Sequence, residues 1–175
     1  MNVNKLLIGG LIISIGAIVF LNVKLSSKNS TTSTRTVTIG SIAPDFSLTT
    51  LDKESFKLSD KKGKAVILFG MAGWCGTCIP EGRALTRIRN EYMGKELEVI
   101  GVAFTKGDNE DFLKEFRELG TVNMPLALDT DNVASKYQLV RLETTYIINK
   151  DGVIVYKDEG FTSYEDYKRE VDKII

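Results

Sequence analysis

Two residues, Cys75 and Cys78, carry the only thiol groups in this 175-residue sequence. They are separated by two residues, follow the apolar run 65–69 and precede a pattern typical of a helix. At this spacing the two sulfurs can close a small disulfide ring. The free N–H groups and partial positive charge of a helix N-terminus stabilise a thiolate on Cys75. The pattern therefore indicates reversible thiol–disulfide chemistry.

The cysteine pair could also be two buried, inert thiols or half of a zinc site. Structural zinc needs about four ligands, and the chain has neither a third cysteine nor a histidine. The lack of histidine also excludes Ser-His-Asp and Cys-His catalysis, the HExxH metal motif and CxxCH haem attachment. We predict no metal and no other cofactor, so acid–base chemistry falls to Asp, Glu, Lys, Tyr or water.

The N-terminal segment reads as a membrane anchor. Residues 6–21 carry no charge, and with the residues up to 25 they reach about 20 positions, or ~30 Å of helix, which is the thickness of the hydrocarbon core. We predict an uncleaved anchor over residues 1–25, in contact with the lipid bilayer through residues 6–25. A cleaved signal peptide and a buried core helix are the alternatives, but no A-x-A-like cleavage site follows the run.

The orientation of this anchor does not follow from charge, because basic residues flank it on both sides. The short N-terminal flank suits a signal anchor, and a dithiol is useful where disulfides form. We therefore expect a single-pass protein of the cell membrane with its C-terminal domain outside the cytoplasm. The formal net charge of zero gives no reason to expect a nucleic-acid partner.

Two further regions follow the anchor. Residues 26–38 are rich in Ser and Thr and predict a flexible linker, whereas residues 39–175 carry the pattern of a folded domain. That pattern predicts a hairpin over 46–49 and 56–58, strands at 65–69, 97–104, 145–148 and 153–156, a short extended piece at 125–128, and helices ending near Tyr92, Gly120, Tyr137 and Ile175. The order of hairpin, then β-α-β-α-β-β-α, indicates an α/β domain whose helices flank a central mixed sheet.

Several segments match one known family. They are Ala43-Pro44-Asp45-Phe46, Trp74-Cys75-Gly76-Thr77-Cys78 with Glu81 three places on, 125–131, and 144–152. With these segments the chain resembles the membrane-anchored, thioredoxin-like oxidoreductases of the TlpA/ResA type, within the AhpC/TSA–redoxin superfamily. The resemblance implies a thioredoxin fold and thiol–disulfide exchange outside the cytoplasm. It also implies protein disulfide substrates such as apocytochrome c, in cytochrome c biogenesis, and a membrane protein that donates reducing equivalents.

The resemblance and the chemistry of a dithiol suggest a role for each site residue. Cys75 attacks a substrate disulfide, and Cys78 resolves the mixed disulfide. Glu81 lies one helical turn from Cys78 and is the candidate acceptor of its proton, the alternative being an ordinary exposed carboxylate. Trp74 is expected to form an apolar lip of the substrate site, unless it serves packing alone.

The sequence departs from the family at Glu143, where relatives carry a cis-proline beside the cysteines. A cis bond before a non-proline residue costs ~2.5–4 kcal/mol, so we expect a trans bond here. Two possibilities stay open for Glu143. Its carboxylate lies near the sulfurs, where it would raise the thiol pKa and alter substrate docking beside Thr144, or it points into solvent.

Three functions compete with that of an oxidoreductase. A binding or scaffold module with weak or lost redox turnover would explain the replacement at Glu143. A peroxiredoxin is disfavoured because Leu68 stands where the proline of the Pro-x-x-x-Thr-x-x-Cys motif would be. A copper chaperone of related fold would need a histidine ligand, which the chain lacks.

Overall fold

The computed structural model describes residues 37–175. The predicted anchor over 1–25 and nearly all of the predicted linker lie outside these residues. From residue 37 onward, no helix has both the length and the apolar character needed to cross a bilayer. Val37, which we placed in the linker, is buried against the domain core, so ordered packing begins before residue 39.

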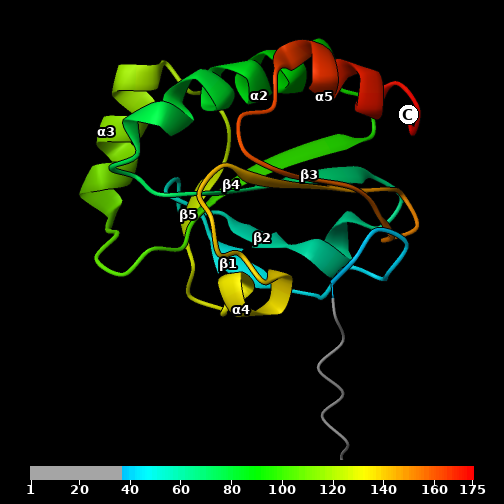
Figure 1. The fold of residues 1–175 in the computed structure, drawn as a ribbon, viewed down its shortest axis with the longest axis horizontal. Helices are drawn as coiled ribbons and strands as arrows, with labels where there is room; N and C mark the ends of the chain where they lie inside the picture. The colour runs from blue at the N-terminus through cyan, green and yellow to red at the C-terminus, as the bar shows by residue number, and fades with distance from the viewer. Residues whose placement is uncertain (1–36) are drawn as a thin grey trace, which may run out of the picture. The chain divides into compact units, whose positions relative to one another are not determined.

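A five-stranded mixed sheet forms the centre of the domain (Figure 1). Its strands, in spatial order, are β5 (Leu126–Leu128), β4 (Leu97–Ala103), β3 (Ala65–Met71), β6 (Thr144–Ile148) and β7 (Ile154–Glu159). Strands β3, β4 and β5 run parallel, whereas β6 pairs antiparallel with both β3 and β7. The predicted mixed sheet is therefore confirmed, with β3 at its middle.

Both faces of the sheet are covered. Helices α2 (Ile79–Glu91), α3 (Glu110–Gly120) and α5 (Tyr164–Val171) pack on one face, and α4 (Val133–Tyr137) packs with the hairpin of β1 (Ser47–Thr49) and β2 (Ser55–Lys57) on the other (Figure 1). Alternate residues of a strand point to opposite faces. Phe69 therefore joins the cluster under α2, and Leu68 joins the cluster under the hairpin, so all of β3 is buried.

Several elements differ from the sequence prediction, and among them β3 continues to Met71 and β7 to Glu159, beyond the predicted strand ends at 69 and 156. The short piece at 126–128 is a true edge strand, since it pairs with residues 101–103 of β4, so the sheet has one strand more than the predicted order. Three residues are too few to show a strand period by themselves. The last helix begins after the Ser163 cap as expected, but it ends at Val171 instead of Ile175.

Candidate active site

The cysteines lie where β3 passes into α2. A 3₁₀ turn over Gly76–Cys78 leads directly into the helix, and Cys75 caps this turn. The structure holds a Cys75–Cys78 disulfide, and the backbone N–H of Cys78 donates a hydrogen bond to Sγ of Cys75 at 3.2 Å. Helix-terminal N–H groups are the donors that would stabilise a thiolate at this sulfur. Cys75 is 4% exposed and Cys78 is 0% exposed, so the expected difference in access is small in this oxidised form.

A network from the β4–α3 connection holds the loop before the cysteines. One oxygen of Asp108 accepts a hydrogen bond from the Gly73 N–H at 2.8 Å. The other accepts from the backbone N–H of Thr105 at 3.0 Å and from its hydroxyl at 2.5 Å. Sequence reasoning missed these residues, because no local pattern links Asp108 to a loop 35 positions earlier.

Trp74 is anchored at one end and open at the other. Its indole N–H donates to Oγ1 of Thr105 at 3.0 Å, while 56% of the residue remains exposed. Beside it lies a hollow of about 180 Å³ that reaches Cys75 and is bordered by Ile79, Phe112 and Leu119. Trp74 therefore presents exposed apolar surface next to Cys75.

Glu81 is completely buried, which excludes the alternative of an ordinary exposed helix carboxylate. Its Oε1 accepts hydrogen bonds from the hydroxyl of Thr145 at 3.0 Å and from the hydroxyl of Tyr167 at 2.5 Å. These two hydroxyls lie 2.7 Å from each other. Oε2 of Glu81 has no hydrogen-bond partner among the described residues. The carboxyl group thus has one oxygen held by two donors and one oxygen free.

Burial is the largest influence on the proton affinity of Glu81 and raises its pKa to about 7. The hydroxyls of Tyr167 and Thr145 and the backbone of Thr162 act in the opposite direction, because they donate to the charged form. The negative charge of Glu143 raises the pKa further. No lysine or arginine of the described residues is among the largest influences on this carboxyl. A pKa near neutrality suits a group that takes up and releases a proton.

Glu143 sits directly before β6, and its peptide bonds are trans, as expected. Its backbone is left-handed, with φ of 59°, and its carbonyl accepts a hydrogen bond from the N–H of Gly160 at 2.8 Å. Glu143 is partly buried, and its negative charge is among the influences that raise the pKa of Glu81. The neighbouring Thr144 is buried, and its hydroxyl donates to the carbonyl of Arg141 at 2.7 Å, which turns this side chain away from solvent.

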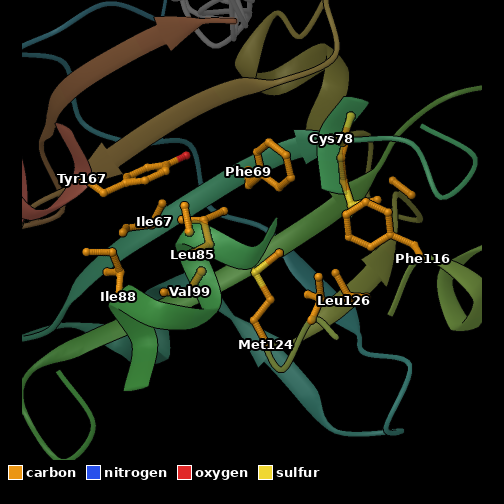
Figure 2. Close-up of a cluster of buried hydrophobic side chains, with 14 of the residues drawn as sticks. Ile67, Phe69, Cys78, Leu85, Ile88, Val99, Phe116, Met124, Leu126 and Tyr167 are labelled. Atoms are coloured by element: carbon orange, nitrogen blue, oxygen red, sulfur yellow. The ribbon is translucent and has the colours of Figure 1, made fainter. Parts of the chain in front are cut away.

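The fold brings all six predicted site residues to one end of the sheet. Thr144 pairs with Gly70 at the end of β3, which places the Glu143 loop beside the turn that carries Trp74 and the cysteines. Sequence reasoning missed Thr145 and Tyr167. The ring of Tyr167 comes from α5 and lies in the same buried cluster as Phe69 and Cys78 (Figure 2). The tyrosine's place in an amphipathic helix pattern predicts burial, but no sequence signal shows that its hydroxyl reaches Glu81.

Comparison with known proteins agrees with this geometry. A model of the AhpC/TSA family matches residues 39–157. Thioredoxin-like protein YneN of Bacillus subtilis is 34% identical to this chain over 134 residues, which are 76% of this chain and 78% of that protein. Thiol-disulfide oxidoreductase ResA of Geobacillus kaustophilus is 31% identical over 139 residues, which are 79% of each protein.

Solved structures show the same architecture. The thioredoxin domain of a thiol-disulfide oxidoreductase from Bacteroides vulgatus is similar with a TM-score of 0.68 and 25% identity, over 78% of this chain and 97% of that one. A thiol:disulfide interchange protein of the thioredoxin family from Chlorobium tepidum is similar with a TM-score of 0.70, over 78% of this chain and 97% of that one. The two sequences are 21% identical, so this similarity supports the fold alone. The expected thioredoxin-like fold is thereby confirmed.

Proposed function

The chain belongs to the AhpC/TSA family of thioredoxin-like proteins and is a thiol-disulfide oxidoreductase, and from this premise we propose that it reduces disulfides in proteins of the cell envelope. The observation that carries the proposal is the Cys75–Cys78 disulfide at the start of α2, next to a buried carboxyl group with one free oxygen. This arrangement provides a dithiol that gives up two electrons and a group that can take a proton.

The reaction begins from the reduced pair. The thiolate of Cys75 attacks one sulfur of the substrate disulfide, so a mixed disulfide forms and the first substrate thiolate leaves and takes a proton from water. Cys78 loses its proton to Glu81 and attacks Sγ of Cys75. The Cys75–Cys78 bond forms, the mixed disulfide breaks, and the second substrate thiolate leaves. Two electrons pass from the dithiol to the substrate, and a membrane donor protein restores the dithiol.

The substrate chain approaches over the lip formed by Trp74 and along the loop that contains Glu143 and Thr144. The exposed indole offers apolar surface next to Cys75. Because the side chain of Thr144 is buried, the substrate meets the backbone of this loop and the partly buried Glu143. A carboxylate at this position favours substrates that do not bring a negative charge near their disulfide.

We also propose the cellular setting. Residues 6–25 anchor the chain in the cell membrane, the following Ser/Thr-rich residues tether the domain, and the domain lies outside the cytoplasm. Apocytochrome c, whose haem-binding cysteines must be reduced before haem attaches, is the proposed substrate. The similarity to a protein named thiol-disulfide oxidoreductase ResA supports the chemistry of this assignment.

The central experiment uses two cysteine variants. Cys78→Ser should accumulate a mixed disulfide with substrate in cells, because the resolving thiol is gone, whereas Cys75→Ser should form none. Purified wild-type protein should reduce oxidised apocytochrome c, and neither variant should turn over. If Cys78→Ser traps nothing and the wild type leaves every disulfide intact, the proposal is wrong. A double variant that supports normal growth and cytochrome content would instead indicate a binding module.

Location needs a separate experiment. A membrane-impermeant thiol reagent should label the Cys78→Ser variant in intact cells after a brief treatment with a reductant, which frees Cys75, the only cysteine left in the chain, from mixed disulfides. Labelling that appears only after the cells are broken would place the domain in the cytoplasm and contradict the proposed setting.

A further inference from the structure

The hydroxyl of Tyr167 reaches the carboxyl of Glu81 from a different helix. Tyr167 comes from α5 and Glu81 from the first turn of α2, 86 residues earlier, yet the two oxygens lie 2.5 Å apart. We infer that Tyr167 is a positioning residue of the redox site: with Thr145 it holds Oε1 of Glu81 and leaves Oε2 free to take the proton of Cys78. This inference rests on the proposed role of Glu81 in disulfide reduction.

The hydrogen bonds around Glu81 are divided unequally between its two oxygens. Both donors, the hydroxyls of Thr145 and Tyr167, converge on Oε1. Oε2 is equally buried but has no partner in the part of the chain that the structure describes. A buried acceptor without a donor costs free energy, so such groups are rare unless the chemistry of the site uses them. The free oxygen belongs to a residue one helical turn from Cys78, on the same face of α2.

The orientation of the carboxyl group depends on its hydrogen-bond donors, which are the two hydroxyls on Oε1 and, with a smaller influence on the pKa, the backbone of Thr162. The other groups that act on Glu81 are the negative Glu143 in the loop before β6 and the backbone of Thr162 before α5. No lysine or arginine of the described residues is among the largest influences on the pKa of Glu81. The like charge of Glu143 cannot attract the carboxylate into one position. The two hydroxyls are therefore the side-chain groups that select which oxygen is free.

Tyr167 acts as a donor throughout the physiological range. It is completely buried, and burial together with the adjacent Glu81 holds its pKa well above the ordinary value for tyrosine. Its proton therefore stays on the hydroxyl, and the mobile proton belongs to Glu81. Each of the two hydroxyls has a single hydrogen, which it donates to Oε1, so the 2.7 Å distance between the Thr145 and Tyr167 oxygens is a close contact and not a third hydrogen bond.

The test is the Tyr167→Phe variant, which keeps the ring and removes the donor. Loss of a donor to a carboxylate disfavours the charged form, so Glu81 should hold its proton to higher pH. We expect the step in which Cys78 resolves the mixed disulfide to slow about tenfold at pH 7, and its pH profile to move upward by about one unit. The first step, attack by Cys75, should keep its rate.

The two steps can be separated in a single turnover. Full-length reduced protein in detergent micelles is mixed with a model peptide disulfide, and the mixed disulfide is followed by acid quenching and mass spectrometry as it forms and decays. Thr145→Val should slow the decay in the same sense, and Glu81→Gln should slow it most. Tyr137→Phe is the matched control, because Tyr137 is also completely buried and donates one hydrogen bond, to the carbonyl of Pro44 at 2.7 Å, on the opposite face of the sheet.

The outcomes distinguish this inference from the proposed function. If the mixed disulfide of Tyr167→Phe decays at the same rate as those of the wild type and Tyr137→Phe, Tyr167 does not position Glu81. If both steps slow together, its role is general packing, and the inference is also wrong. If the wild-type protein forms no mixed disulfide at all, the proposed function itself fails. If Tyr167→Phe does not fold, a carboxyl titration by NMR in Thr145→Val replaces it, and an unchanged Glu81 midpoint in that variant would overturn the inference.

Discussion

Gly73 and Phe112 approach so closely that any side chain at position 73 would force neighbouring atoms to move. A Cβ built on Gly73 would lie 2.7 Å from Cβ of Phe112 and 2.8 Å from the Phe112 carbonyl carbon. The loop before the cysteines therefore packs directly against the first turn of α3. The same loop is held by Asp108 through the Gly73 N–H. The position of the disulfide depends on this close approach.

Gly73→Ala should lower the free energy of unfolding by about 1–3 kcal/mol, because the added methyl group must displace backbone atoms of α3. Urea unfolding of the disulfide form of the full chain in detergent measures this. Gly76→Ala is the matched control, since a Cβ on Gly76 meets nothing within 4 Å. Equal stabilities for the two variants would contradict the packing argument.

The stability of the disulfide form should fall as pH rises from about 5 to 8. The pKa of Glu81 is about 7 in the folded chain, against an ordinary value of 4.5, so the folded state binds more protons than the unfolded state between these values. The contribution is complete below the unfolded-state pKa and is lost as pH rises through the folded-state pKa. The full change amounts to about 3 kcal/mol.

This window is informative because the chain has no histidine and the cysteines are in a disulfide. Carboxylates whose pKa is lowered in the folded chain, such as Asp52 and Asp172, change the stability at pH values below this window. Unfolding measured at several pH values should show the decline in the wild type. Glu81→Gln should be flat across the window, and a decline that survives in this variant would assign the effect to another group.

Glu143→Gln should lower the pKa of Glu81, because it removes the like charge that raises it. The pH at which stability declines should therefore move downward by a fraction of a pH unit. NMR titration of the Glu81 carboxyl measures the same shift directly. Glu54→Gln, an exposed carboxylate in the hairpin on the other face of the sheet, is the control and should leave the midpoint unchanged. A midpoint that is the same in both variants would show that Glu143 does not act on Glu81.

Glu143→Gly should change stability little or raise it slightly. Glu143 has φ of 59°, a left-handed conformation that costs an L-residue roughly 1–2 kcal/mol and costs glycine nothing. Against this stands the greater chain entropy that glycine loses on folding, ~0.5–1 kcal/mol. Glu143→Pro should be clearly destabilising, because proline requires φ near −65°. Thermal unfolding of the two variants should therefore rank them with glycine above proline, and the reverse order would refute the left-handed backbone at this position.

Trp74 is the only tryptophan in the chain, so intrinsic tryptophan fluorescence reports on the active-site loop alone. Asp108→Ala should alter the emission of Trp74 and lower stability by about 1–3 kcal/mol, because it leaves the Gly73 N–H and the Thr105 N–H without their acceptor. Asp129→Ala is the matched control. Asp129 also accepts two backbone N–H groups, at the start of α4, and lies outside the network of Trp74. The control should lose similar stability without a change in emission, and identical spectra for the two variants would argue against the loop network.

Much of the fold was predictable because its signals are local. Residues close together in the sequence provide the signals for the strand at 65–69, for the helix after the cysteines and for the Asp151-Gly152 turn. Gly152 adopts the positive φ of 80° that such a turn requires. The edge strand β5 was missed because its three residues become a strand only through pairing with β4. The end of α5 was predicted at Ile175, beyond its actual end at Val171, because helix ends depend on local capping more than on apolar spacing.

By itself, the sequence determined the chemistry of the site. It contains a Cys-x-x-Cys pair at a helix start, a carboxylate one turn later and no histidine, and this combination supports dithiol exchange. Only the tertiary structure decided the state of that carboxylate. Burial of Glu81 results from packing α2 against the sheet and α5, and its two donors come from positions 64 and 86 residues away. The electrostatic environment of a group depends on all atoms around it in space, whereas the order of residues along the chain shows only its neighbours in sequence.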